Sequence, residues 1–166
     1  AQQKAFCAEH VLAGDKPAIC ITEPEAGSAA TEMQTTAHKQ GGKYILNGTK
    51  HWITGGGVSK LHLVFARVLD EAGSLQGIGG FILFADPTAE GVPKGFTVVG
   101  REHTMGICGM PEAELRFDNI EIDEKWLIKP PSGLKHGFAD LMNAYNSQRV
   151  GAGTIALGVA AGALEH

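Results

Sequence analysis

The chain has 166 residues, of which 43% are hydrophobic and 19% are charged, and its formal net charge is -4. This length suffices for one ordinary domain but not for two full ones, and the composition excludes a largely disordered chain. The 14 Lys and Arg residues are outnumbered by 18 Asp and Glu residues and form no cluster, so nucleic acid is not an expected partner.

The cysteine and histidine residues indicate neither disulfides nor a metal site. Cys7, Cys20 and Cys108 lie far apart and form no CxxC pair, which fits a reducing cytoplasm. Cys108 has no basic neighbour that would activate its thiol, so we expect it to be packed. The seven histidines form no HxxxH or HExxH pattern. Residues 1–12 lack the charged start and the long apolar run of a signal peptide.

The expected elements begin with a helix and continue with short strands. Residues 1–13 have a partial apolar face and are predicted to be the end of a helix. A short strand follows at residues 18–22. Residues 44–46 and 50–54 are predicted to be two strands joined by a tight Asn-Gly turn.

More short strands follow, separated by turn residues and by a polar loop over residues 70–79. They are expected at residues 61–68, 80–85, 96–99, 114–117 and 120–122. Because no helical pattern interrupts these strands, they predict a mainly antiparallel closed β-barrel or a sandwich.

A helical period returns after the Pro-Pro-Ser-Gly run at residues 130–133 and continues to the last residue. Its most apolar stretch, residues 150–164, is shorter than the roughly 20 residues of a membrane span, so we expect a buried helix and no span. We interpret the chain as a β-domain from a longer helical protein. Residues 1–14 would end an N-terminal helical domain, residues 15–130 would form the barrel, and residues 131–166 would begin a C-terminal helical domain.

Two strand ends carry the residues of chemical interest. Thr22 follows an apolar strand and precedes a proline turn and the pair Gly27 and Ser28. Trp52 and Thr54 end another strand, directly before three glycines. Together the two strand ends would place backbone N–H groups, two hydroxyls and an indole near one mouth. Such a mouth suits a flat ring that forms hydrogen bonds.

Several motifs together resemble the acyl-CoA dehydrogenase family over nearly the whole chain. They are TEPEAGS at residues 22–28, NGTK at 47–50, WIT at 52–54, Met105-Gly106, LRFDNI at 115–120, Gly137-Phe138 and Arg149. The resemblance implies a middle domain that is an antiparallel β-barrel flanked by partial α-helices at both ends. It also implies FAD, bound between the barrel and the C-terminal helices.

The resemblance implies roles for individual residues. Thr22 would bond the N1/O2 edge of the flavin, Trp52 would pack beside the ring, and Thr54 would bond near N5. Donors already aimed at N1/O2 stabilise the charge of the reduced ring without reorganising. The implied cofactor-binding residues are Cys20, Ile21, Thr22, Gly27, Ser28, Trp52, Ile53 and Thr54. The implied substrate-binding residues are Ser28, Tyr145, Asn146, Gln148 and Arg149. A salt bridge within a helix bundle for Arg149, and a plain core role for Tyr145, stay open.

The family's reaction is α,β-dehydrogenation of an acyl-CoA thioester, in which a glutamate removes the α-proton and a hydride passes to flavin N5. In some branches this glutamate directly precedes the helix arginine that Arg149 matches, and this chain has Gln148 there. A glutamine cannot act as the base. The remaining candidates, which are Glu102, Glu112, Glu114 and Glu121, are better interpreted as solvated charges. We therefore expect no catalytic base in this segment and no turnover by the segment alone.

The chain departs from the family pattern in ways that indicate a divergent branch. Glu25 replaces a usual glycine and Ala29 a usual aspartate, which puts the phosphate environment in doubt. Cys108, Met110 and Glu112 stand where the family often has Arg-x-Ser-x-Thr, which puts any hydroxyl role there in doubt.

Three alternatives to a dehydrogenase remain. One is an acyl-CoA oxidase or a flavin monooxygenase of the same fold, and the others are a non-catalytic ligand-binding β-barrel and an interaction domain. The expected partners are an acyl-CoA, an electron-transfer flavoprotein as electron acceptor, and further copies of the chain in a dimer or tetramer. The expected location is the cytoplasm, or the mitochondrial matrix in a eukaryote. Acyl length and branching cannot be read from this segment, nor whether residues 164–166 are native or a tag.

Overall fold

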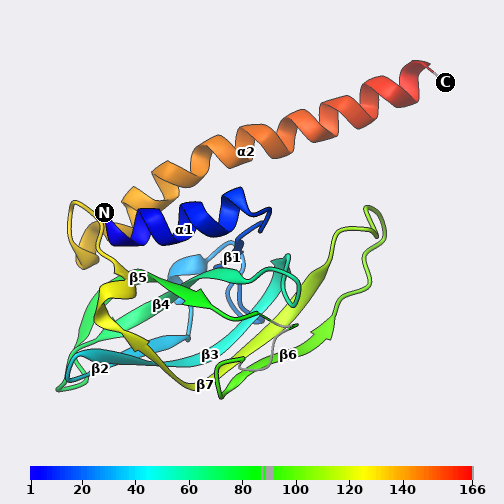
Figure 1. Cartoon of the computed structure of the whole chain (residues 1–166). Coiled ribbons are helices and arrows are strands. Elements are labelled where there is room, and N and C mark those ends of the chain that lie inside the picture. Colours follow the sequence, from blue (N-terminus) through cyan, green and yellow to red (C-terminus); the bar gives the residue numbers. More distant parts are fainter. Residues whose placement is uncertain (87, 89–91, 166) are drawn as a thin grey trace.

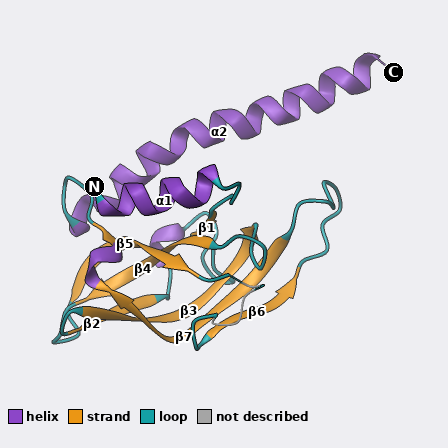
Figure 2. Cartoon of the chain, viewed as in Figure 1, coloured by secondary structure: helices purple, strands orange, loops and turns teal. Residues whose placement is uncertain are grey.

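A computed structural model describes residues 1–86, 88 and 92–165 of the chain. Eight strands form one sheet in the order β6-β7-β3-β2-β4-β5-β8, and β1 pairs with β4 off this path. The strands are β1 Ala18–Cys20, β2 Thr36–Gln40, β3 Lys43–Thr54, β4 Leu61–Leu69, β5 Leu75–Phe84, β6 Phe96–Arg101, β7 Glu112–Asp123 and β8 Leu127–Ile128. The helices α1 Gln2–Leu12 and α2 Leu134–Glu165 lie over one face of this sheet (Figures 1 and 2). Two short 3-10 turns, Ala30–Glu32 and Glu124–Trp126, complete the fold.

The expectation of a closed antiparallel barrel is wrong in two respects. The sheet is mixed, because both β1 and β2 run parallel to β4, where Ala18 pairs with His62 and Thr36 with Arg67. The sheet is also open over the described residues, with β6 and β8 at its two ends. The expectation was based on the spacing of short strands with no helices between them. Alternating apolar residues do not specify the direction of the neighbouring strand.

The Asn-Gly pair at residues 47–48 is not a turn, which corrects a second expectation. It lies within the continuous strand β3, which pairs with β2 on one side and with β7 on the other. The register with β7 shifts between Leu46 and Gly48, so the pair forms an irregularity within the strand. The Asn47 carboxamide oxygen accepts a hydrogen bond of 2.8 Å from the backbone N–H of Asn119. Because β3 pairs with a strand on each side, the backbone at Asn47 and Gly48 continues the strand although this dipeptide favours a turn.

Other boundaries also differ from those expected. Residues 75–79, expected in a loop, begin β5, and the two strands expected at residues 114–117 and 120–122 are the single strand β7. Strands β2 and β8 were not expected. The core lies on the sheet face whose side chains alternate inward from several strands, including Leu46, Ile53, Val64, Phe81, Leu115 and Phe117.

Helix α2 begins against the sheet and then leaves it. Leu134 packs against the core, and Gly137 is buried. The expectation that residues 150–164 are buried is wrong for this chain, because Val150 is 72% exposed and Leu157 is 72% exposed. Figure 1 shows this half of α2 extending away from the other elements. No helix among the described residues combines the length and apolar character that a membrane span requires.

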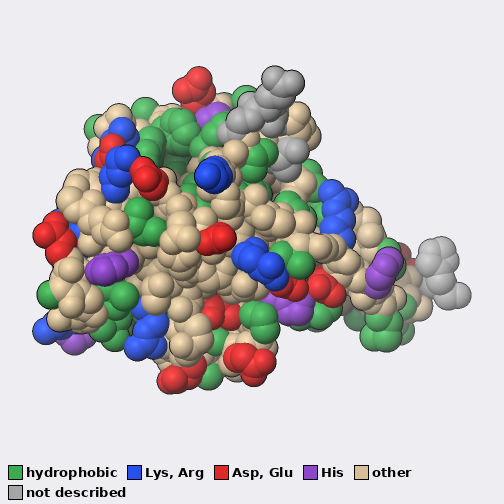
Figure 3. Space-filling view, turned by 90° about the horizontal axis from the view of Figure 1, so that it is seen from below, with side chains coloured by type: hydrophobic (Ala, Val, Ile, Leu, Met, Phe, Trp, Pro, Cys, Tyr) green, Lys and Arg blue, Asp and Glu red, His purple; other side chains and the backbone are tan. Residues whose placement is uncertain are grey.

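Charged side chains are spread over the face of the molecule seen in Figure 3. Acidic and basic groups are interspersed there. Lys43 on β3 and Glu121 on β7 form an exposed ion pair. The chain has 18 acidic and 14 basic residues, and this face carries side chains of both signs.

The start of α2 depends on a close approach at Gly77 on β5. A Cβ atom there would lie 2.1 Å from the Leu134 carbonyl oxygen, and Gly77 has a φ of +131°. Gly77→Ala is therefore expected to lower the free energy of unfolding by about 2 kcal/mol or more, measured by urea denaturation. Gly42→Ala is the matched control, because no atom lies within 4 Å of its Cβ position. The control should change stability by less than about 0.5 kcal/mol. Equal effects of the two substitutions would contradict the proposed contact.

Candidate functional site

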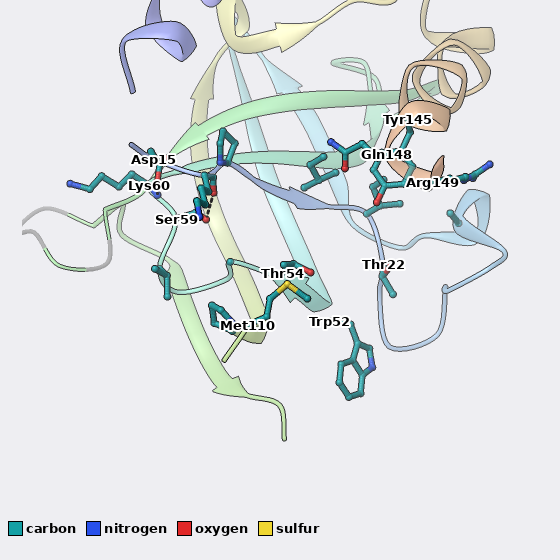
Figure 4. A pocket seen from close by; sticks show the side chains of 18 of the residues that line it. Asp15, Thr22, Trp52, Thr54, Ser59, Lys60, Met110, Tyr145, Gln148 and Arg149 are labelled. Atoms are coloured by element: carbon teal, nitrogen blue, oxygen red, sulfur yellow. Dashed lines mark hydrogen bonds between the residues drawn. The ribbon is translucent and has the colours of Figure 1, made fainter. Parts of the chain in front are cut away.

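A cleft of about 1360 Å³ lies between α2 and the loops at one end of the sheet. Thr22 and Thr54 both line it, together with Trp52, so the two strand ends singled out in the sequence share one hollow. Figure 4 shows Tyr145, Gln148 and Arg149 on the helix side and Thr54, Met110 and Trp52 on the strand side. Thr22 lies between these two groups in this view.

The first wall of the cleft is the loop that follows β1. Its members Ile21, Thr22, Gly27 and Ser28 line the cleft. Glu23 N–H donates to the Ala26 carbonyl at 3.1 Å, and Ala26 N–H donates back at 3.2 Å, which closes a tight turn. This turn presents Gly27 and Ser28 to solvent at the mouth.

The second wall is the end of β3, where the strand has a bulge. The register with β7 shifts between Lys50 and Ile53, and Trp52 adopts a φ of +56°. This left-handed conformation is uncommon for a residue with a bulky side chain. It leaves the Trp52 side chain at the cleft, and the residue is 49% exposed. Strained backbone of this kind often lies at functional sites.

Thr54, two residues further along β3, has a hydrogen-bond partner that the sequence did not reveal. Its hydroxyl donates to Oε1 of Glu112 at 2.6 Å. Glu112 was expected to be a solvated charge, but it stands opposite Thr54 in the pairing of β3 with β7. Because the hydroxyl hydrogen is directed to Glu112, the Thr54 oxygen keeps its lone pairs available to a ligand.

The third wall is α2, which contributes Tyr145, Gln148 and Arg149. Residues three and four apart lie on one face of a helix, so this spacing directs the three side chains to the same side. Asn146 does not line the cleft, and its carboxamide oxygen accepts a hydrogen bond of 3.0 Å from Arg149 Nη1. Asn146 thus contacts Arg149, and its predicted contact with the substrate stays a prediction.

Two predicted cofactor-binding side chains lie behind the wall. Cys20 and Ile53 are buried in the core, at 0% and 1% exposure. Burial raises the pKa of the Cys20 thiol to about 12, against an opposing effect of the nearby Lys50 ammonium. These side chains support the walls, and a binding role for their backbone atoms stays a prediction.

Several lining residues were missed by sequence reasoning, among them Asp15, Ser59 and Lys60. Asp15 accepts hydrogen bonds from the backbone N–H groups of Lys60 and Leu61 at 3.0 and 2.9 Å. It therefore joins the turn after α1 to the start of β4. These residues lie in loops without a motif, so only their position in space reveals them.

Cys108 is exposed, which corrects the expectation that it is packed. Its thiol donates to the Thr104 carbonyl at 3.3 Å. The next residues along this loop, Gly109 and Met110, line the cleft. The loop between β6 and β7 thus forms part of the rim.

A group of potential metal ligands lies beside the bulge. His51 Nε2 is 2.8 Å from Oε1 of Glu102, and a carboxylate oxygen of Glu114 completes the group within 4.8 Å. Glu102 and Glu114 were expected to be solvated charges, yet both are partly buried. Imidazole and carboxylate ligands suit a divalent cation. The hydrogen bond between His51 and Glu102 explains why these two side chains lie close together, and it requires no cation.

The left-handed conformation of Trp52 gives a test of backbone strain at the cleft. Trp52→Asn is expected to raise the free energy of unfolding by about 0.5 to 1 kcal/mol, because asparagine tolerates a positive φ and the indole is half exposed. Trp52→Val is expected to lower it by about 1 kcal/mol, because a β-branched side chain fits this conformation poorly. Urea denaturation of both variants measures the difference. A valine variant as stable as the asparagine variant would show that the bulge carries no strain.

Curated relatives match the chain along almost its whole length. It is 57% identical over 165 residues to a 3-sulfinopropanoyl-CoA desulfinase of Variovorax paradoxus, an alignment that covers 99% of this chain and 41% of that protein. It is 38% identical over 166 residues to an acyl-CoA dehydrogenase of Bacillus subtilis, again with 99% and 41% covered. The chain thus spans about two fifths of the length of the curated relatives it matches.

A solved structure and a family model agree with these relatives. A glutaryl-CoA dehydrogenase of Mycobacterium smegmatis in complex with FADH2 superimposes with a TM-score of 0.65 at 30% identity, covering 76% of this chain and 30% of that one. The family model described as the middle domain of acyl-CoA dehydrogenase matches residues 18–120, which run from β1 into β7 and include both strand-end walls of the cleft. The chain therefore belongs to the acyl-CoA dehydrogenase family, and it contains the middle domain of that family.

Proposed function

We propose that this chain supplies part of the FAD site and part of the CoA-thioester site of an enzyme that acts as a 3-sulfinopropanoyl-CoA desulfinase. The observation that carries the proposal is the 57% identity, over 99% of this chain, to a protein of that name. Gln148 at the cleft is compatible with it, because this position then supplies no base for removal of an α-proton.

The residues of the cleft fit a flat ring that forms hydrogen bonds. Thr22 and Thr54 bring hydroxyls from the loop after β1 and from the end of β3, and Trp52 adds an aromatic ring to the lining of the same cleft. Gly27 has no atom within 4 Å of its Cβ position, so the backbone there is open to close approach. When bound, FAD supplies a redox-active ring beside the thioester. Thr22, Thr54 and Trp52 are the residues that would hold and orient that ring.

The reaction named for the relatives balances without an outside oxidant. The bond between C3 and sulfur breaks, C3 gains a hydrogen, and water joins the released SO₂ unit. 3-Sulfinopropanoyl-CoA and water then give propanoyl-CoA and hydrogen sulfite. On the side of this chain, Arg149 brings a positive charge to a cleft that must accept an anionic substrate. Gln148 beside it can donate and accept hydrogen bonds but stays neutral.

A second candidate is α,β-dehydrogenation of an acyl-CoA. The 38% identity to the acyl-CoA dehydrogenase of Bacillus subtilis favours it, as does the family itself. This reaction leaves an electron pair that an acceptor must remove, and an electron-transfer flavoprotein is the acceptor we expect. It also needs a base from outside this chain, because Gln148 cannot provide one. The cytoplasmic location and the dimer or tetramer stay predictions that accompany either function.

The two candidates differ in their need for an electron acceptor, which makes them separable. The complete protein that carries this chain is expected to release sulfite from 3-sulfinopropanoyl-CoA under anaerobic conditions with no acceptor present. Colorimetric sulfite detection and chromatography of propanoyl-CoA measure the two products. Reduction of a redox dye by butanoyl-CoA, without any sulfite release in the first assay, would replace the desulfinase with the dehydrogenase. A colourless protein that is inactive in both assays would contradict both candidates.

A further inference from the structure

A buried ion pair lies behind the cleft wall. The Lys50 side chain has no exposed surface, and its Nζ lies 2.8 Å from Oε1 of Glu23, whose side chain is 5% exposed. Burial lowers the pKa of Lys50, and the contact with Glu23 opposes this. Burial acts to raise the pKa of Glu23, but its hydrogen bonds, that from Lys50 first, lower it overall. The hydrogen bonds that Glu23 accepts therefore favour its carboxylate form, and the Glu23 carboxylate in turn favours the charged form of Lys50 against the effect of burial.

Lys50 and its neighbour on β3 hold the loop after β1 by its backbone. Lys50 Nζ also donates to the Ile21 carbonyl at 2.9 Å. The backbone N–H of His51 donates to the Thr22 carbonyl, also at 2.9 Å. Two consecutive carbonyls of the loop thus point toward β3. The Ile21 and Thr22 side chains line the cleft beside Trp52, which follows His51 directly.

Glu23 fixes the far side of the same loop. Its Oε2 accepts a hydrogen bond of 2.6 Å from the Gln34 N–H, and its Oε1 accepts one of 3.0 Å from the Thr35 N–H. The carboxylate therefore joins the two ends of residues 23–34, a segment that includes Gly27 and Ser28. Backbone N–H donors and the ammonium together use both oxygens of the carboxylate.

Stability alone does not account for this pair. Moving two charges out of water is costly, and apolar residues of similar volume often serve the folded state equally well. The pair instead imposes one geometry, because it forms hydrogen bonds with three backbone groups, the Ile21 carbonyl and the N–H groups of Gln34 and Thr35. Ile21 itself lines the cleft, and so does Thr22, which directly precedes Glu23.

We propose that Lys50 and Glu23 are positioning residues that set the distance between the two flavin-facing walls, the loop after β1 and the bulge of β3. The proposal rests on the proposed function, because it takes FAD to be the ring held between those walls. Neither side chain lines the cleft, so both act through Thr22 and Trp52.

The main test removes both charges while keeping the volume, with Lys50→Met and Glu23→Leu combined in the complete protein. We expect a lower thermal midpoint, because the Ile21 carbonyl and the Gln34 and Thr35 N–H groups lose their partners, and an affinity of the folded protein for added FAD that is about 10-fold lower. Lys43→Met is the matched control, since Lys43 lies on the same strand and pairs at the surface with Glu121. The control should bind FAD like the wild type. A double variant with unchanged FAD affinity would overturn the proposal.

A second readout does not depend on FAD. This chain has two tryptophans, so a background in which Trp126 and every tryptophan outside this chain are replaced by Phe leaves Trp52 as its own probe. We expect the Trp52 emission maximum of the apoprotein to shift in the double variant and to stay in place in the Lys43→Met control. An unchanged maximum would show that the pair does not hold the bulge. If the double variant does not fold, Lys50→Arg, which keeps the charge but changes the geometry, is measured in its place by both readouts.

These outcomes separate the positioning role from the proposed reaction. A wild-type protein that binds FAD but releases no sulfite would refute the reaction, while the comparison of FAD affinities would still decide the role of the pair. A wild-type protein that binds no FAD would refute the proposed function, and with it the part of the proposal that concerns flavin. The Trp52 emission would then decide whether the pair sets the two walls.

Discussion

The bulge in β3 is the constraint on which the cleft depends. In a regular strand, side chains alternate between the two faces, so residues 50, 52 and 54 would share one face. In this structure Lys50 is buried, whereas Trp52 and Thr54 lie at the cleft and Ile53 fills the core between them. The register shift between Lys50 and Ile53 makes this change of face possible. Residues 50–54 can then supply both the buried Lys50 side chain and the Trp52 and Thr54 side chains that line the cleft.

The other two walls are placed relative to this segment by different means. The loop after β1 is bound through its backbone carbonyls, which accept from Lys50 and His51. Helix α2 is placed from the opposite end of the sheet, where Gly77 lets the Leu134 carbonyl approach β5 closely. The cleft is thus formed by segments far apart in the chain, and the sheet holds these segments in their relative positions. A substitution in the sheet can therefore alter the cleft without touching it.

The sequence was a good guide to the strand ends and a poor guide to what surrounds them. Thr22 and Thr54 could be placed at one mouth because each follows an apolar run and precedes turn residues. The partner of Thr54, the Glu112 carboxylate, could not be found, because it depends on the register of β7 against β3. The Asn-Gly pair at residues 47–48 misled for a related reason. Pairing on both sides of a strand outweighs a local preference for a turn.

The parallel strands and the exposed half of α2 lie further beyond sequence reasoning. Apolar alternation in β1 and β2 states which face is buried but not which way β4 runs beside them. The apolar run at residues 150–164 is of a kind that is usually buried, but in this chain it is exposed. The composition of a segment does not reveal which other segment would cover it. Both errors concern relations between elements, whereas the elements themselves were mostly found.

The position of Cys108 has a practical consequence for work in solution. Cys20 is fully buried with a raised pKa, and burial also raises the pKa of Cys7, whereas Cys108 stands exposed on the rim loop next to Gly109 and Met110. Thiol-directed reagents should therefore react with Cys108 in preference to Cys7 and Cys20. A maleimide fluorophore attached there would sit at the entrance, where its colour and brightness could follow ligand entry in real time without any engineered cysteine.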